Sequence, residues 1–410
     1  MKVKFREIAN FVAGQSPKSE YYSNSKGVPF LQGNRTFGTF YPTIDTYTTK
    51  TTKIANKGDI LMSVRAPVGD LNFAPIDLCI GRGLASITAK DGDNAFLFYA
   101  LKYNINNLLK QSNGTTYDSV TGDIVKDMDM IIPEDKTTCK KISNLLYGID
   151  SKIDKNAKII SELEAMAKTV YDYWFLQYEF LNEEGKPYKS SGGKIVYNEN
   201  LKREIPEGWD VKSIKECIEH INTGLNPRDN FVLGNGNIKY ITVKNLTKEG
   251  IFNYDGCDVI DEKAKEIVHN RSDVNVGDIL FASIAPLGRC FMVQEYPKEW
   301  DINESVFCIR PNQQIISTDY LYLYLTSDMF VKQAENSSTG SIFSGIRINT
   351  LESMNLLVPN EKIKEKFTHN IEKIFLKKYK IAKENEELTK LRDELLPLLM
   401  NGQVGFKEWY

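Results

Sequence analysis

Two long stretches of the chain carry apolar residues at heptad spacing. The first stretch holds two interleaved series of sevens, the second series displaced from the first by four residues. The positions are Ile142, Ile149, Asn156, Leu163 and Val170 in one series, and Leu146, Ile153, Ile160, Ala167 and Trp174 in the other. The second stretch, near the C-terminus, repeats the pattern at Phe367, Ile374, Ile381, Leu388 and Leu395. Such series form the apolar seam of a coiled-coil helix, so we predict two helices of about 30 residues, each about 45 Å long.

Neither of these two helices can bury its apolar stripe alone. We therefore expect the two helices to pack against each other. One seam position, Asn156, is polar. A polar residue at such a position commonly fixes the register and pairing of coiled-coil helices at some cost in stability. We expect the two paired helices to form a spacer that holds two β-rich domains apart.

The stretch that precedes each long helix is β-rich. Asp59–Val64 and Asp278–Ser283 are short apolar runs that begin at Gly-Asp and end near a proline, which is typical of a strand entered from a turn. Phe96–Leu109 and Tyr320–Phe330 space their apolar residues by three and four. This spacing predicts short helices packed on the sheet.

The two β-rich stretches repeat one another in order. The matching landmarks are Gly14 and Gly224, Pro17 and Pro227, Gly58-Asp59-Ile60-Leu61 and Gly277-Asp278-Ile279-Leu280, Gly69 and Gly288, Gly114 and Gly340, and Pro133 and Pro359. The order is kept while the separation between partners drifts, as expected when strands are retained and loops vary. A single Gly-Asp-Ile match could be chance, but an ordered series over a whole half indicates a tandem duplication.

The predicted fold class is α+β. Two β-rich domains lie in tandem duplication, each is followed by a long coiled-coil-forming α-helix, and the two helices pack together as a spacer. The predicted segments are a first domain at 1–137, its helix at 138–180, a polar and turn-rich linker at 181–207, a second domain at 208–360 and a second helix at 361–410.

Composition and charge limit the classes of function. Of the 410 residues, 41% are hydrophobic and 26% charged, as in a globular protein, and the net charge is −2. This charge is not that of a simple electrostatic DNA binder, so any DNA binding has to come from local basic clusters or a basic partner. We expect no membrane span and no signal peptide. The six cysteines are scattered, which argues against a zinc site and fits a cytoplasmic protein.

The sequence contains no recognisable catalytic motif. The chain has no Pro-Pro, which excludes the Asn/Asp-Pro-Pro-aromatic loop of an amino-group methyltransferase, and it has no phosphate-binding G-x-x-x-x-G-K-[ST] loop. His220, His269 and His369 lack metal-ligand spacing. The acidic string before Lys136 fits the first turn of a helix better than a nuclease site. We therefore expect no catalytic residue and no metal ligand, and interpret the duplicated chain as a binder.

The duplicated motifs resemble a known family. Gly14-Gln15-Ser16-Pro17 is followed by Gly58-Asp59-Ile60-Leu61, by Ser63-Val64-Arg65-Ala66-Pro67-Val68-Gly69, by Ser112-Asn113-Gly114-Thr115, by Pro133 and by a long helix. This order resembles the target-recognition domains of type I restriction-modification specificity subunits, and the resemblance covers essentially the whole chain. The second copy has Ile284 where the first has Arg65, so a DNA contact is not carried over to that position.

This resemblance implies a non-catalytic specificity subunit with two target-recognition domains. Each domain would read one half of a split, asymmetric DNA site, and the paired helices would set the gap between the halves. The helices would also dock two methyltransferase subunits, and motor-endonuclease subunits would join that core to methylate adenine or to restrict. S-adenosylmethionine, ATP and magnesium would belong to those partners, and this chain would bind none of them.

Loops that follow strands are the expected reading surface. Arg, Lys, Asn, Gln, Ser and Thr side chains in such loops reach base edges and phosphates, and glycine allows close backbone approach. The predicted DNA contacts of the first domain are Gln15, Ser16, Lys18, Asn34, Arg35, Arg65, Arg82, Asn113 and Thr115. Those of the second are Asn226, Arg228, Lys244, Asn245, Arg289, Ser338, Thr339, Ser341 and Arg347. Gly58-Asp59 and Gly277-Asp278 are assigned to turn architecture.

The end of the first helix is the predicted docking surface for a partner. Its aromatic residues, taken as exposed, are Tyr171, Tyr173, Trp174 and Phe175, although Trp174 also fits the intramolecular seam. Two other functions stay open at this point. One is an adaptor without DNA, in which two β-rich domains bind protein or glycan on a helical scaffold. The other is a DNA enzyme whose catalytic motif is not recognised.

Overall fold

The chain divides into two compact units. The computed structural model describes residues 1–111, 120–337 and 345–406. Unit 1 consists of Met1–Asn156 together with Glu384–Tyr410, and unit 2 is Ala157–Lys383. Each unit therefore holds one β-rich domain and a part of both long helices. Among the described residues, no helix has the length and apolar character needed to cross a membrane.

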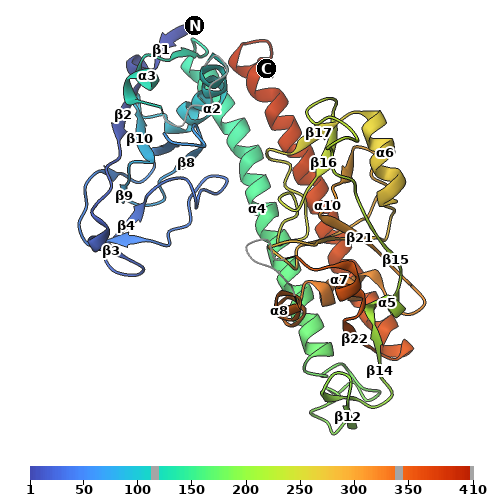
Figure 1. Cartoon of the computed structure of the whole chain (residues 1–410). Coiled ribbons are helices and arrows are strands. Elements are labelled where there is room, and N and C mark those ends of the chain that lie inside the picture. Colours follow the sequence, from blue (N-terminus) through green and yellow to red (C-terminus); the bar gives the residue numbers. More distant parts are fainter. Residues whose placement is uncertain (112–119, 338–344, 407–410) are drawn as a thin grey trace. The chain divides into compact units, whose positions relative to one another are not determined.

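The two predicted long helices are present. They exceed the predicted length of about 30 residues, but they end before the predicted segment bounds at 180 and 410. They are α4 (Lys136–Phe175) and α10 (Glu361–Met400), each of 40 residues (Figure 1). At 1.5 Å per residue each is about 60 Å long. The buried members of the predicted seam in α4 are Ile142, Leu146, Ile149, Asn156, Ile160, Ala167 and Trp174. Heptad spacing therefore identified the face of α4 that is buried.

In unit 1 the two helices pack against each other, as predicted. The Asn156 side-chain amide donates hydrogen bonds to Glu384 Oε2 (2.7 Å) and to Asn385 Oδ1 (2.9 Å). Arg392 Nη1 lies 2.7 Å from Asp150 Oδ1. Residue numbers rise along α4 as they fall along α10, so the helices run antiparallel. Asn156 is 1% exposed and bonds across the interface, as a residue that sets helix register is expected to do.

A tyrosine joins the buried Asp150–Arg392 ion pair of unit 1. Asp150 also accepts a hydrogen bond from the hydroxyl of the buried Tyr99, with an O–O distance of 2.9 Å. Tyr99 lies on α2 (Asn94–Gln111), which belongs to the first β-rich domain. This contact connects the domain to the helix pair.

Unit 2 repeats the arrangement with different residues. Glu164 on α4 accepts hydrogen bonds from Lys378 Nζ of α10 (2.6 Å) and from the Tyr322 hydroxyl (2.9 Å). Tyr322 lies on α7 (Thr318–Leu325), a helix of the second domain. Burial lowers the pKa of Lys378, and the Glu164 carboxylate opposes this shift. In both units α4 supplies the acid and α10 the base.

The domain of unit 1 contains two sheets. The first is antiparallel, in the order β2 (Ala9–Ala13), β10 (Leu84–Ala89), β7 (Ile60–Ser63) and β8 (Leu71–Phe73). The second has the order β3 (Tyr22–Ser23), β5 (Tyr47–Thr48), β4 (Val28–Leu31), β9 (Leu78–Ile80) and β6 (Ile54–Ala55), and β4 runs parallel to β9. The predicted strand over Asp59–Val64 is thus confirmed as β7.

The domain of unit 2 repeats the four-stranded sheet and has a smaller second sheet, of three strands where unit 1 has five. Its antiparallel sheet has the order β15 (Ile218–Thr223), β21 (Val306–Pro311), β18 (Ile279–Ala282) and β19 (Cys290–Met292). Its second sheet has the order β17 (Asp258–Ile260), β16 (Ile238–Ile241) and β20 (Trp300–Ile302), with β16 parallel to β20. Both copies contain a cis Ala-Pro peptide bond, at Pro67 and Pro286. The tandem duplication is therefore a duplication of the fold.

Short elements complete each copy. In unit 1 they are β1 (Lys2–Lys4), α1 (Phe5–Ile8), the 3-10 helix Ser19–Tyr21, α3 (Gly122–Lys126) and β11 (Asp129–Ile131), and β1 pairs with β11. In unit 2 they are β14 (Asp210–Ser213), α5 (Ile214–Cys217), α6 (Glu262–Ser272), α8 (Asp328–Ser337), α9 (Ile348–Glu352) and β22 (Asn355–Val358), and β14 pairs with β22. The helix predicted over Tyr320–Phe330 is two helices, α7 and α8.

The two Gly-Asp turns are architectural, as predicted. Gly58 and Gly277 have φ values of +87° and +93°, a region that favours glycine. The Asp59 carboxylate accepts hydrogen bonds from the Asn56 backbone N–H and from the Ser86 hydroxyl. Each turn therefore ties the entry of one strand to the sheet.

The predicted linker at 181–207 is more ordered than its composition indicates. It contains a hairpin of β12 (Ile195–Asn198) and β13 (Arg203–Pro206). The Tyr188 ring stacks on Phe180 with the ring centroids 4.6 Å apart, and Phe180 stacks on Trp209 at 5.1 Å. These aromatic residues give the segment a small core, which its composition, rich in glycine and lysine, does not indicate.

The predicted exposure of the four aromatic residues at the end of α4 is wrong for three of them. Tyr171, Trp174 and Phe175 are buried, and only Tyr173 is exposed. The ring centroids of Phe175 and Phe367 lie 4.7 Å apart, so this end of α4 packs on α10. The three buried rings belong to the core of unit 2 and offer no surface to a partner.

The buried ion pair of unit 1 generates a stability prediction. Arg392→Met leaves the Asp150 carboxylate buried without its partner, so the free energy of unfolding should fall by about 3–5 kcal/mol. Lys152→Met is the control, because the Lys152–Glu384 pair is about half exposed and should contribute less than about 1 kcal/mol. Urea denaturation followed by circular dichroism measures the free energy of unfolding of both variants. Equal losses would show that the buried ion pair contributes no more to stability than the exposed one.

Candidate nucleic-acid interface

A glycine-flanked turn at residues 81–83 joins three strand ends in unit 1. The turn connects β9 to β10. The Gly14 N–H donates to Leu84 O (2.9 Å), the Gly81 N–H to Leu31 O (2.8 Å), and the Val64 N–H to Gly83 O (2.9 Å). The ends of β2, β4 and β7 therefore meet at this turn, which we call the reading turn.

Two glycines of unit 1 lie where backbones approach closely. A Cβ atom at Gly14 would lie 2.2 Å from the Gly81 carbonyl oxygen, and one at Gly83 would lie 2.6 Å from the Gln32 carbonyl oxygen. Ser16 fixes the loop after β2, because its hydroxyl accepts a hydrogen bond from the Arg82 N–H (3.1 Å). The structure thus brings together Ser16 and Arg82, which are distant in sequence, along with the neighbouring Gln15.

Arg65 and Arg82 are the unpaired cations at this edge. Arg65 follows Val64, the residue bonded to the reading turn, and Arg82 lies within the turn. Both side chains are exposed, and neither guanidinium group forms a hydrogen bond or ion pair with a described residue. A guanidinium fork without a carboxylate partner is available for phosphate oxygens or for the O6 and N7 atoms of guanine.

The other predicted contacts of the first domain lie on adjoining loops, where acidic partners already bind them. The Asn34 amide donates to Asp70 Oδ2 (2.6 Å). The Arg35 guanidinium donates to the Asp45 carboxylate and lowers its pKa. Lys18 lies 3.9 Å from Glu20 and is exposed. Asn113 and Thr115 lie outside the described residues.

Unit 2 contains the same turn at residues 303–305. The Asn303 N–H donates to Ile241 O (2.8 Å), and the Ser283 N–H donates to Ser305 O (3.0 Å). A Cβ atom at Gly224 would lie 1.8 Å from Ile302 O. Residues 303–305 therefore form the reading turn of unit 2.

The side chains of the two reading turns differ in charge. The position of Arg65 is occupied by Ile284 in unit 2, and the position of Arg82 is occupied by the exposed Glu304. Sequence reasoning missed Glu304, because the offset between the copies is 288 − 69 = 219 at Gly69 and Gly288 but 304 − 82 = 222 at the turn. The two units therefore present different chemistry on one backbone frame.

Three predicted contacts of the second domain are exposed on loops of unit 2. The Ile346 N–H donates to Ser283 O (2.8 Å), which places the exposed Arg347 near the end of β18, where Ser283 bonds to the reading turn. Arg228 and Lys244 are exposed on the loops that follow β15 and β16, and Asn226 is half-buried. Ser338, Thr339 and Ser341 lie outside the described residues.

Two predicted contacts of the second domain point inward. Asn245 is buried, its Oδ1 accepts a hydrogen bond from the Thr242 N–H, and its Nδ2 donates to Asn253 O. It holds its own loop closed, so its prediction as an exposed DNA reader is wrong. Arg289 is half-buried and donates to Leu246 O at 3.1 Å, so this guanidinium is partly occupied.

His269, Asp301 and Tyr296 form a hydrogen-bonded group, the histidine cluster, at β20, which is the strand before the reading turn of unit 2. His269 Nδ1 lies 2.9 Å from Asp301 Oδ2, and the Tyr296 hydroxyl lies 2.9 Å from His269 Nε2. The buried Asp301 also accepts a hydrogen bond from Ser272. Hydrogen bonding to Asp301 raises the pKa of His269. Residues 1–111, 120–337 and 345–406 contain no group of three or more His, Cys, Asp or Glu residues arranged to hold a metal ion.

The sequence family follows from a direct comparison. The family described as "Type I restriction modification DNA specificity domain" matches residues 1–165 and again residues 206–390. The chain belongs to this family. The two matches coincide with the two copies of the fold, so the prediction of a DNA specificity subunit rather than an enzyme is confirmed.

Several specificity subunits have sequences similar to this chain. The MjaIX specificity subunit of Methanocaldococcus jannaschii is 27% identical over 361 residues, which is 87% of this chain and 80% of that protein. The putative MjaX specificity subunit of the same organism is 39% identical over 162 residues, covering 39% of this chain and 38% of that protein. The HindI specificity subunit of Haemophilus influenzae is 23% identical and covers 72% and 73% of the two chains.

A solved structure has the same fold. The crystal structure of a type I restriction-modification S subunit from M. genitalium matches with a TM-score of 0.54 and 17% identity. The match covers all of this chain and 96% of the other. It agrees with the predicted fold class, two β-rich domains each followed by a long helix.

The unpaired arginines of this specificity subunit generate a DNA-binding prediction. Arg65→Ala should weaken recognition of one half-site by about 1–3 kcal/mol and leave the other half unchanged, because unit 2 has Ile284 at this position. Arg6→Ala is the control, since Arg6 is exposed and pairs with Asp127. Competition binding with DNA mutated in either half measures the effect. Equal losses at both halves would refute the assignment of one unit to one half-site.

The histidine cluster generates a pH prediction. The raised pKa of His269 means that its contribution to stability is complete below about pH 6.5 and disappears as the pH rises through the folded-state pKa. The melting temperature of wild type should therefore exceed that of His269→Gln by more at about pH 6 than at about pH 9. Thermal denaturation across this range measures the difference, and a gap that widens with pH would be the contrary result.

Proposed function

We propose that this chain reads a two-part, asymmetric DNA sequence, one half with each unit. The observation that supports this proposal most is the reading turn, which recurs in unit 2 with two of the same backbone bonds and with different side chains. Arg65 and Arg82 in unit 1 suit the acceptor atoms of guanine or phosphate oxygens. Glu304 in unit 2 suits the amino group of cytosine. Two readers of different chemistry give two different half-sites.

In this proposal the chain directs partner subunits that carry out the chemistry. Modification subunits methylate adenine with S-adenosylmethionine, and restriction subunits use ATP and magnesium, all in the cytoplasm. The net charge of −2 supports such sharing, because partners can supply much of the phosphate contact. The predicted absence of a cofactor on this chain belongs to the same proposal.

An apolar stripe on α4 supports docking of a modification subunit. Ile159, Met166 and Tyr173 are 37%, 55% and 38% exposed, and they recur every seven residues. Heptad spacing places them on one face, apart from the seam that packs on α10. Exposed apolar side chains in a row mark an interaction site more often than scattered ones do. This stripe replaces the buried aromatic residues as the proposed docking surface, and Tyr173 belongs to both.

Modification sequencing tests the proposed function. DNA is taken from cells that express this chain together with a type I modification subunit from the same organism, and from cells without the chain. The expected result is a methylated two-part motif with a fixed gap that depends on the chain. If a soluble complex forms but no chain-dependent methylation appears, the proposed reading function is refuted.

The helix pair should set the gap between half-sites. Seven residues inserted into α4 between Asn156 and Glu164, with seven matched residues in α10 between Lys378 and Glu384, preserve both buried ion pairs and the apolar seam. The helices then lengthen by about 10 Å, so the gap should grow by up to about three base pairs.

Inserting seven residues into α4 alone is the control for this experiment. It moves one helix past the other and should abolish methylation instead of changing the motif. The same modification sequencing reads out both variants. An unchanged gap in the matched double insertion would show that the helices do not set the spacing.

A further inference from the structure

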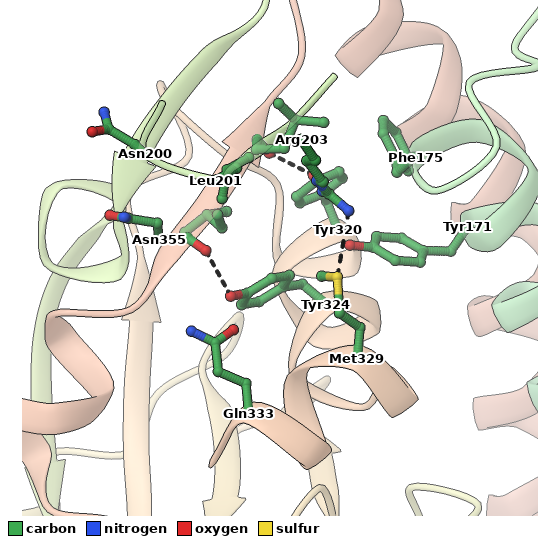
Figure 2. A pocket seen from close by; sticks show the side chains of 12 residues that line it. Tyr171, Phe175, Asn200, Leu201, Arg203, Tyr320, Tyr324, Met329, Gln333 and Asn355 are labelled. Atoms are coloured by element: carbon green, nitrogen blue, oxygen red, sulfur yellow. Dashed lines mark hydrogen bonds between the residues drawn. The ribbon is translucent and has the colours of Figure 1, made fainter. Parts of the chain in front are cut away.

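Unit 2 contains a cavity of about 270 Å³ built around an arginine (Figure 2). The arginine is Arg203 on β13. The floor is aromatic and comes from α4 and α7. The floor residues are Tyr171, Phe175, Tyr320 and Tyr324. Helix α8 contributes Met329 and Gln333, and the rest of the wall comes from the hairpin and from β22.

Arg203 has no anionic partner among the described residues. Its one hydrogen bond runs from Nη1 to the sulfur of Met329, at 3.4 Å, and a thioether is a weak acceptor. Its Nε atom is buried and has no hydrogen-bond partner. Buried nitrogen donors of a charged group are costly to leave unpaired. In Figure 2 the Arg203 side chain reaches toward Met329 and the Tyr171 ring, into the space that the floor encloses.

The remaining wall offers no negative charge to Arg203. None of the lining residues is Asp or Glu. The Tyr324 hydroxyl donates to Asn355 O and the Tyr320 hydroxyl to Leu357 O, so both phenols are anchored to β22. Burial raises the pKa of both tyrosines, which keeps them neutral. Amide side chains, including the exposed Asn200 and Gln333, stand at the wall as further polar groups.

We propose that this cavity binds a small organic carboxylate with an apolar, ring-sized body. The planar guanidinium fork of Arg203 matches a carboxylate, with which it can form two parallel hydrogen bonds. A single arginine suits one negative charge, and the aromatic and aliphatic wall suits an apolar body. The volume equals that of about nine water molecules in the liquid, which is room for about ten non-hydrogen atoms.

This site is separate from DNA reading. It shares no residue with the reading turn of unit 2 or with the predicted DNA contacts. Its arginine lies on the β12–β13 hairpin, which in the sequence falls between the two copies of the duplicated fold. The proposal therefore does not rest on the proposed function, and either one can fail without the other.

Fluorine NMR of the full chain with 4-fluorobenzoate tests the proposal. The probe carries one carboxylate on an apolar ring of the required size. Wild type should broaden and shift the fluorine signal in a saturable manner. The neutral analogue 4-fluorobenzamide should bind about tenfold more weakly or worse, because it cannot form the charge-assisted pair. This comparison uses wild type alone, so it stands even where a variant fails to fold.

Two variants locate the binding. Arg203→Met keeps the apolar stem and removes the charge, and it should weaken 4-fluorobenzoate binding by about tenfold or more. Lys202→Met is the matched control on the same hairpin, since Lys202 is exposed and does not line the cavity, and it should bind like wild type. Thermal melting confirms that each variant is folded.

Three results would overturn the proposal. The first is an absence of saturable binding to wild type at millimolar probe. The second is equal binding of the benzoate and the benzamide. The third is binding to a folded Arg203→Met that equals binding to wild type, which would place the probe elsewhere.

Discussion

An ion pair links α4 to α10 in each unit, at their buried interface. Burying either ionised side chain without its partner would cost several kcal/mol. Asp150 meets Arg392 in unit 1, and Glu164 meets Lys378 in unit 2. A slip of one helix along the other would separate both pairs, so these contacts and the Asn156 bonds allow one register. Tyrosines from the β-rich domains bond to both acids, which fixes each domain to its own part of the helix pair.

The reading turns show how a constant frame carries variable chemistry. Backbone hydrogen bonds and glycine contacts at Gly14 and Gly224 define the frame, and these do not depend on the identity of neighbouring side chains. Arg82 and Glu304 occupy equivalent positions of the two turns, and their side chains take no part in the backbone hydrogen bonds that define the frame. Recognition can therefore change at one turn without disturbing the sheet that supports it, which is what a family of sequence readers requires.

The sequence predicted the helices, the duplicated domains and the Gly-Asp turns, because heptad spacing and local turn chemistry determine them. It did not predict the reading turns, because the parallel pairing of β4 with β9 joins strands far apart in the chain. Asn245 was misjudged since an asparagine in a turn serves its own backbone as readily as a ligand. Tyr171 and Phe175 were misjudged since the packing of Trp209, Tyr320 and Phe367 over them is a tertiary property.

In the proposed function, one antiparallel helix pair carries two independent readers of DNA. A chain in which residues 2–131 replace residues 210–358 tests it most directly, because both segments begin and end at the paired strands β1–β11 and β14–β22. Because α4 and α10 run antiparallel in each unit, we expect modification sequencing of this chain to give an inverted repeat of the half-site assigned to unit 1. A direct repeat, or survival of the half-site assigned to unit 2, would contradict the account.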